Sequence, residues 1–176
     1  WRGIRMCLDR PDIFKTQLRA LLRAAADGHI KVMLPMVSTL DEVERTRALI
    51  AECCEELRSE GKRFAEFPLG IMIETPGAAL GSDALAGVAD FFALGTNDLT
   101  AYTLAVDRGE NAEITAARAP VVVDLGLEVL RRQSRASGHT RIRICCRSFR
   151  LDRHGFSLGH RTRRARHAVV DSLLRI

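Results

Sequence analysis

The spacing of apolar residues changes several times along the chain, and these changes predict an alternation of helices and strands. Residues 14–26 carry apolar side chains three or four positions apart, which is typical of an amphipathic helix. Residues 30–34, 69–73 and 90–94 are short and almost continuously apolar, as buried strands are. Residues 39–60 predict a long charged helix.

Further elements keep the same alternation. They are helices over 78–87, 99–105 and 120–136 and a strand over 141–146. The long helix is expected to begin after Ser38, with Asp41 as the third residue of a capping box, and to end at Gly61. Apolar strands that alternate with helices predict a parallel sheet covered by helices, in the α/β class.

The composition fits one globular domain followed by a segment of a different kind. The chain has 176 residues, 47% of them hydrophobic, and no apolar run reaches the roughly 20 residues that span a membrane. Its net charge is +5, but residues 147–176 contain eight arginines against two aspartates. We therefore expect a domain over 1–146 and an atypical Arg-rich tail over 147–176. The tail has no base-reading or base-stacking motif, so we do not expect nucleic-acid binding.

The cysteines argue against a disulfide framework. They are Cys7, Cys53, Cys54, Cys145 and Cys146. Their number is odd, and neither adjacent pair has the C-x-x-C spacing of a metal site. A reducing cytoplasm suits such a chain, and no export signal is recognised at its start.

Polar side chains follow the predicted strands at the points where the strands end. Glu74 comes directly after residues 69–73, and Asn97 and Asp98 follow residues 90–94. The carboxyl ends of parallel strands converge on one face of an α/β barrel, where sites are built. Two carboxylates that meet there suit Mg²⁺, which is usually held by one or two carboxylates. The alternative is that the two acids are helix caps or surface groups, and that Asn97 or Asp98 simply caps the helix over 99–105.

Other residues have chemistry that suits the same face. A guanidinium binds phosphate or carboxylate through its planar fork, and Arg108 is a candidate for this role, as are Arg2 and Arg5. Cys145 lies at the end of the predicted fourth strand, where its thiol could donate a proton. Each has an ordinary alternative, which is a solvated surface arginine or a buried, inert cysteine.

Five segments together resemble a known enzyme family. They are WRGIR at 1–5, QLRALLRA at 17–24, VMLPM at 32–36, GIMIETP at 70–76 and DFFALGTNDLTAYTLAVDRG at 90–109. Over these segments the chain resembles the phosphoenolpyruvate (PEP)-binding C-terminal domain of enzyme I, the PEP–protein phosphotransferase of the bacterial sugar phosphotransferase system. Related PEP enzymes share the GTNDLT segment, and its continuation over residues 102–108 favours enzyme I over them.

The resemblance implies a fold, a cofactor and roles for individual residues. The fold would be a partial (β/α)8 TIM barrel with outer helices, in which the early strands are missing and the C-terminal end is atypical. Glu74 and Asp98 would be the ligands of Mg²⁺. The residues that would contact PEP are Arg2, Asn97, Asp98 and Arg108. Cys145 would deliver a proton to the enol carbon.

The resemblance also implies partners. In the family the phosphoryl group passes from PEP to a histidine on an N-terminal domain and then to a small carrier protein for sugar uptake, and the barrel domain forms a homodimer. A complete barrel needs about 250 residues, so we expect this chain to be inactive in isolation. Two alternatives stay open: a piece of PEP synthase or pyruvate phosphate dikinase, and a non-catalytic remnant that binds PEP or dimerises.

Overall fold

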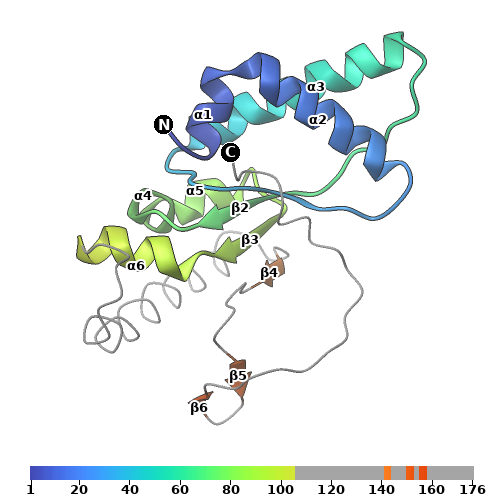
Figure 1. The fold of residues 1–176 in the computed structure, drawn as a ribbon. Helices are drawn as coiled ribbons and strands as arrows, with labels where there is room; N and C mark the ends of the chain where they lie inside the picture. Colours follow the sequence, from blue (N-terminus) through green and yellow to red (C-terminus); the bar gives the residue numbers. More distant parts are fainter. Residues whose placement is uncertain (106–140, 144–149, 153–154, 158–176) are drawn as a thin grey trace.

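The computed structural model describes residues 1–105, 141–143, 150–152 and 155–157 (Figure 1). The helices in this part of the chain are α1 (Ile4–Asp9), α2 (Pro11–Ala25), α3 (Leu40–Ser59), α4 (Pro76–Leu80), α5 (Ser82–Ala86) and α6 (Thr96–Leu104). The strands are β1 (Val32–Leu34), β2 (Leu69–Ile73), β3 (Phe91–Leu94), β4 (Arg141–Arg143), β5 (Arg150–Asp152) and β6 (Gly155–Ser157). The helix predicted over 120–136 lies outside the described residues.

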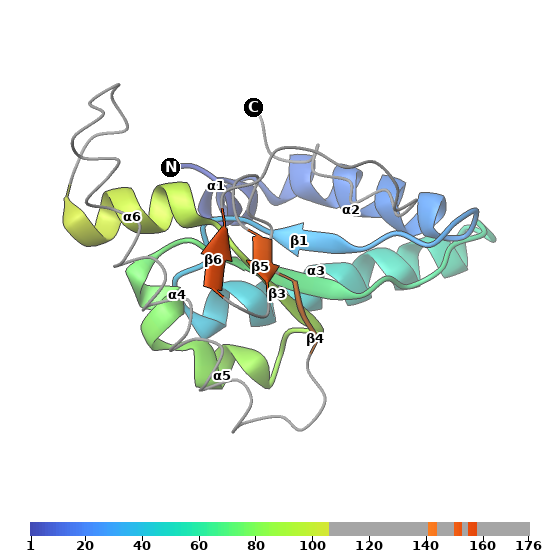
Figure 2. The ribbon, with the colours of Figure 1, turned by 90° about the horizontal axis from the view of Figure 1, so that it is seen from below.

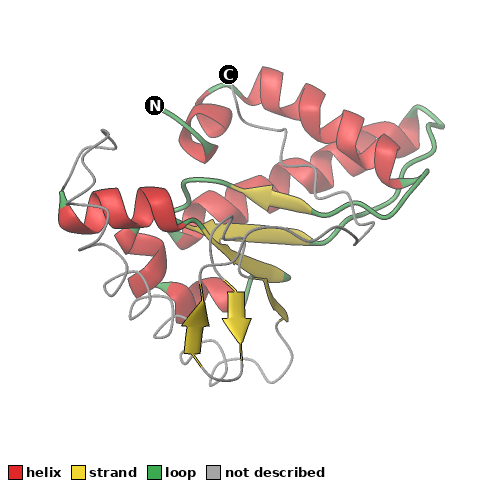
Figure 3. Ribbon diagram, turned by 60° about the horizontal axis from the view of Figure 1, so that its bottom comes forward, coloured by secondary structure: helices red, strands yellow, loops and turns green. Residues whose placement is uncertain are grey.

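Strands β1 to β4 form one parallel sheet in the order β1-β2-β3-β4 (Figure 3). Helix α3 connects β1 to β2, and α4 and α5 connect β2 to β3, as the crossovers of a parallel sheet require. This confirms the predicted α/β class with parallel strands. Strands β5 and β6 pair with each other in a separate antiparallel sheet, within the residues 147–176 that we expected to be a tail. That the four parallel strands belong to a barrel stays a prediction.

The hydrophobic core lies between the sheet and one face of each long helix. Helix α2 buries Phe14, Leu18, Leu21 and Leu22, which are the positions whose spacing predicted it. All four residues of β3 are buried, and so are four of the five residues of β2. A strand that is buried on both faces needs apolar side chains at successive positions, which explains the continuous apolar runs.

The start of α3 differs from the prediction. Its N-cap is Thr39, and the acid of its capping box is Glu42. The carboxylate of Glu42 accepts hydrogen bonds from the backbone N–H groups of Ser38 (2.6 Å) and Thr39 (3.0 Å). Asp41 is exposed and lies 3.8 Å from Arg45 instead. The prediction of Ser38 with Asp41 is therefore wrong by one residue, because adjacent hydroxyl and acidic residues offer two registers of the same box.

The segment after β2 also differs from the prediction. The single helix expected over 78–87 is two short helices that meet at Gly81, whose N–H donates to the carbonyl of Gly77 at 2.9 Å. Helix α1 was not predicted, because only Ile4, Cys7 and Leu8 mark its buried side within six residues. Short helices carry too little periodicity to be recognised in a sequence.

Ion pairs join α2 and α3, which lie side by side (Figures 1 and 2). Lys15 pairs with Glu52 at 3.3 Å and with Glu56. Arg19 pairs with Glu56 at 3.0 Å and with Glu60 at 2.7 Å. The hydrogen bond from Lys15 lowers the pKa of the Glu56 carboxyl.

No helix in the described part of the chain has both the length and the apolar composition to cross a bilayer.

Replacement of Glu56 with Gln should weaken the pH dependence of stability. Because folding lowers the pKa of Glu56, its carboxylate stabilises the fold above the unfolded pKa of about 4.3. That contribution is lost as the pH falls through the lower pKa of the folded state. Urea unfolding of the parent and of Glu56→Gln, from neutral pH into the acid range, should show a lower midpoint for the variant at neutral pH and a smaller change on acidification.

Glu44→Gln is the matched control, because Glu44 is an exposed carboxylate on the same helix outside these ion pairs. Identical pH profiles for the Glu44 and Glu56 variants would contradict the prediction.

Candidate functional site

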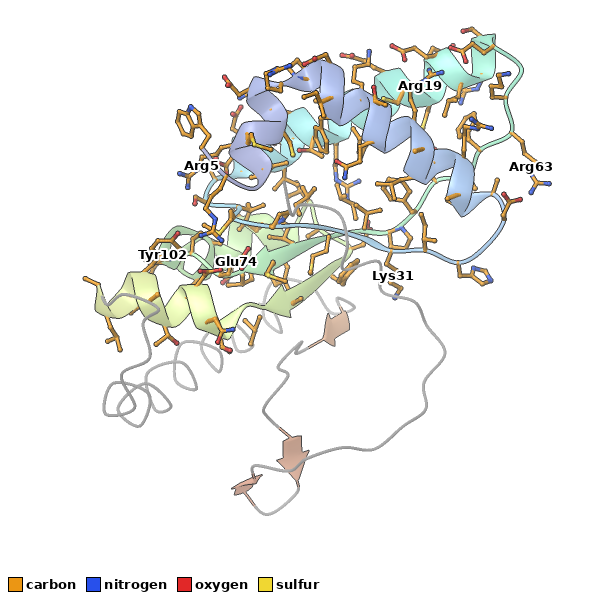
Figure 4. All side chains as sticks on the ribbon, viewed as in Figure 1. Arg5, Arg19, Lys31, Arg63, Glu74 and Tyr102 are labelled. Atoms are coloured by element: carbon orange, nitrogen blue, oxygen red, sulfur yellow. The ribbon has the colours of Figure 1, made fainter. Side chains whose placement is uncertain are left out.

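The carboxyl ends of β2 and β3 bring two of the predicted site segments together. Ile73 pairs with Leu94 in the sheet, so Glu74 and Gly95 leave neighbouring strands at the same level. The N–H of Gly95 donates to the carbonyl of Ile73 at 2.9 Å. Figure 4 shows Glu74 at this end of the strands and Lys31 at the opposite end, before β1. The expected convergence of polar residues is therefore present between β2 and β3.

The side chain of Glu74 is buried at this edge of the sheet, with an exposure of 6% for the residue. Its Oε1 accepts a hydrogen bond of 2.7 Å from the backbone N–H of Met36. A Cβ added at Gly95 would stand 2.8 Å from Oε2 and 2.6 Å from the Cβ of Glu74. Glycine at position 95 is therefore what allows the carboxylate to lie where it does. A carboxylate buried in this way needs such partners, because burial without them is costly.

Asp98 reaches the same edge from the first turn of α6. The helix has Gly95 as its N-cap, so Asn97 and Asp98 lie inside the first turn, and the alternative that either residue caps the helix is wrong. Asp98 is 8% exposed, and its Oδ2 lies 3.6 Å from Nη2 of Arg2. Asn97 is exposed. Arg2 and Asp98, which are far apart in the sequence, thus form an ion pair in the first turn of the helix that Gly95 caps.

The segment before α1 contacts the loop after β1 through Gly3 and the first turn of α6 through Arg2. Gly3 packs so closely on Met36 that a Cβ at Gly3 would stand 2.6 Å from the Cβ of Met36. Its φ of 62° lies in the left-handed region, which glycine adopts without strain. Because Met36 holds Glu74 and Arg2 pairs with Asp98, this segment links the two carboxylates.

A second charged pair lies beside the site. Nε of Arg5 is 3.2 Å from Oε1 of Glu42, and Nη2 of Arg5 donates to the hydroxyl of Ser38 at 2.9 Å. The hydroxyl of Ser38 donates in turn to that of Thr75 at 3.3 Å. Sequence analysis missed the contribution of Glu42, Ser38 and Thr75, because hydroxyl and capping residues carry no signal beyond the local turn.

Two of the predicted site residues, Arg108 and Cys145, lie outside the described residues. Strand β4 ends at Arg143, so the predicted strand over 141–146 is described only in its first half. The cysteines of residues 1–105 are buried, and burial raises the pKa of each thiol; they are Cys7, Cys53 and Cys54. All three belong to the buried hydrophobic core, so they are packing residues.

The two carboxylates fit a hard divalent cation. Mg²⁺ takes oxygen ligands and is usually held by one or two carboxylates together with substrate oxygens and water. Glu74 is a buried carboxylate directly after β2, and Asp98 is a buried carboxylate in the first turn of α6, just beyond the neighbouring strand β3. Within the described residues no group of three or more His, Cys, Asp or Glu could hold a metal.

Comparison with known proteins places the chain among PEP enzymes. Residues 1–147 match the family described as PEP-utilising enzyme, PEP-binding domain. A phosphoenolpyruvate-protein phosphotransferase of Haemophilus influenzae is 51% identical over 110 residues. Proteins of the same name from Priestia megaterium and Staphylococcus carnosus are 47% and 49% identical over 109 residues. These matches confirm the resemblance that the motifs indicated.

The aligned regions cover unequal shares of the compared proteins. They take up 62% of this chain in the Haemophilus influenzae match and 61% in the other two. In each case they take up 19% of the relative, so the chain spans about a fifth of the length of the curated relatives it matches.

Gly95→Ala should destabilise the fold and displace Glu74. The added methyl would meet the Cβ of Glu74 at 2.6 Å, and forcing extra volume into a packed site costs about 1–3 kcal/mol. The free energy of unfolding in urea measures the effect. Gly28→Ala is the matched control, because no atom lies within 4 Å of a Cβ at that position. We expect the control to be neutral or slightly stabilising, by up to about 1 kcal/mol; equal losses in the two variants would show that the contact with Glu74 is not the cause.

Proposed function

The chain belongs to the PEP-utilising enzymes through their PEP-binding domain, and on that premise we propose that it binds PEP and Mg²⁺ as part of a PEP–protein phosphotransferase. One observation carries the proposal. The buried carboxylate of Glu74 directly follows β2, the buried carboxylate of Asp98 lies in the first turn of α6 just beyond the neighbouring strand β3, and the guanidinium of Arg2 lies beside Asp98. Carboxylates suit the cation, and a guanidinium suits the anionic substrate.

We propose Glu74 and Asp98 as the ligands of Mg²⁺. An ion held there would neutralise negative charge on the phosphate and carboxylate of PEP. Glu74 is preorganised for this role by the Met36 N–H and by the close fit against Gly95. Asp98 lies in the first turn of α6, where the N-terminal end of the helix dipole stabilises negative charge.

The groups that we propose for PEP itself are Arg2, Asn97, Asp98 and Arg108. The side chain of Arg2 is 59% exposed although it pairs with Asp98, and a guanidinium has five N–H donors, so it retains donors for phosphate oxygens. Asn97 is exposed on the same turn as Asp98, where its amide can donate to an anionic oxygen. Arg108 follows α6 in the sequence and would add a second guanidinium.

The reaction that we propose breaks the P–O bond of PEP and forms a P–N bond to a histidine on another domain. The enol oxygen keeps the electron pair of the broken bond, and a proton then joins the methylene carbon to give pyruvate. We propose the thiol of Cys145 as the source of that proton. The phosphoryl group would pass on to a small carrier protein for sugar uptake, and the domain would act as a homodimer.

We also propose that the four parallel strands are part of a (β/α)8 barrel. A barrel of this kind has eight parallel strands, and its active site lies at their carboxyl ends. The position of Glu74 after β2 and of Asp98 beyond β3 supports this arrangement. The family match ends at residue 147, which supports a boundary before the Arg-rich segment.

Two other functions would use the same edge of the sheet. PEP synthase and pyruvate phosphate dikinase also bind PEP, but the relatives named above are all PEP–protein phosphotransferases. A non-catalytic remnant would bind PEP with Mg²⁺ and form no pyruvate when it is mixed with a histidine-bearing domain and a carrier protein of this kind. Pyruvate formation in such a reconstituted mixture therefore distinguishes an enzyme from a remnant.

Asp98→Asn should abolish Mg²⁺-dependent binding of PEP to the 176-residue chain. The substitution preserves the shape of the side chain but removes the charge that a hard cation requires. Isothermal titration of PEP with Mg²⁺ present, and again with a chelator, measures the effect. Asp83→Asn is the matched control, since Asp83 is an exposed carboxylate in the first turn of α5. Unchanged PEP affinity in Asp98→Asn would remove Asp98 from the metal site.

A further inference from the structure

Two hydrogen bonds that run in opposite directions join the loop after β1 to the turn after β2. The backbone N–H of Met36 donates to Oε1 of Glu74 at 2.7 Å, and the hydroxyl of Thr75 donates to the carbonyl of Val37 at 2.7 Å. Both bonds are buried. Each turn thus supplies one donor and one acceptor, and neither turn can shift without breaking a bond to the other.

The backbone at Met36 has a strained conformation that neighbouring groups must hold in place. Its φ of 57° lies in the left-handed region, which side chains other than glycine adopt only where the surroundings enforce it. Gly3 packs against the side chain of Met36. Two residues after Met36 in the chain, the backbone N–H of Ser38 donates to the Glu42 carboxylate at 2.6 Å. The direction of the Met36 N–H, and with it the orientation of Glu74, is therefore imposed by its neighbours.

The Thr75 hydroxyl connects the loop after β1, which contains Met36, to the turn that contains Glu74. Besides donating to Val37, it accepts the N–H of Ala78 at 3.1 Å and the hydroxyl of Ser38 at 3.3 Å. Thr75 is 5% exposed, so water cannot readily replace these partners. Thr75 is also adjacent to Glu74 in the chain. A shift of the loop after β1 would therefore move Thr75 and, with it, the carboxylate of Glu74.

We propose that Thr75 is a positioning residue for the candidate metal site. By holding the carbonyl of Val37, its hydroxyl keeps the N–H of Met36 directed at Glu74 and so fixes the orientation of that carboxylate. The consequence for the metal rests on the proposed function, in which Glu74 is a ligand. Groups that orient the ligands of a metal typically change its affinity about 10- to 100-fold when they are removed.

The test compares three variants of the 176-residue chain by amide hydrogen exchange. Thr75→Val removes the hydroxyl and keeps the shape, whereas Thr75→Ser keeps the hydroxyl. Thr46→Val is the matched control, because the buried hydroxyl of Thr46 also donates to a backbone carbonyl at 2.7 Å, that of Glu42. We expect the Met36 amide to exchange about tenfold faster in Thr75→Val, from the loss of a buried hydrogen bond, and at the parent rate in the other two variants.

A role limited to capping α4 gives a different result. In that case the Ala78 amide, which donates to Thr75, would exchange faster in Thr75→Val while the Met36 amide kept its parent rate. That result would overturn the proposal, as would equal acceleration at Met36 in Thr46→Val.

The second measurement is the affinity for Mn²⁺, used as a spectroscopic probe for Mg²⁺ and titrated by electron paramagnetic resonance. We expect Thr75→Val to weaken Mn²⁺ binding about tenfold or more and the other two variants to match the parent. Equal Mn²⁺ affinity in Thr75→Val and the parent would overturn the role in metal binding. If the parent chain binds no Mn²⁺, the proposed function is contradicted. Faster exchange at Met36 in Thr75→Val would still show, in that case, that Thr75 orients Glu74.

Discussion

The burial of the Glu74 carboxylate is the constraint on which the arrangement of this edge of the sheet depends. Burial of a charged group is costly unless hydrogen bonds or an opposite charge compensate for the lost hydration. Here the Met36 N–H supplies one bond, and the glycine at position 95 supplies the space. Both come from other turns, so the burial of one side chain fixes the relative positions of the ends of β1, β2 and β3.

The N-terminal segment owes its position to the same constraint. Gly3 can lie against Met36 only because it has no Cβ, and this contact places Arg2 beside Asp98. Farther from the site, the ion pairs between α2 and α3 hold the helices that cover the sheet. The fold thus combines a buried polar edge, where geometry is strict, with exposed charge pairs whose geometry can vary.

Sequence patterns were sufficient for the larger elements within residues 1–105. The spacing of Phe14, Leu18 and Leu22 identified α2, and the apolar run over residues 69–73 gave β2 with its bounds. The same patterns failed at α1 and at the break in the segment after β2, where fewer than two turns of helix carry too little periodicity. The capping box of α3 was displaced by one residue because Thr39 and Glu42 adjoin equally suitable alternatives.

The sequence by itself determined which residues have the right chemistry: two carboxylates that follow apolar strands, and motifs typical of PEP enzymes. Only the tertiary structure decided how that chemistry is oriented. The donor to Glu74 is a backbone amide, which every residue except proline possesses, and its direction depends on a left-handed turn held by Gly3 and by the Glu42 carboxylate. A backbone N–H has no signature among the side chains of a sequence, so its partner becomes known only when distant turns are packed together.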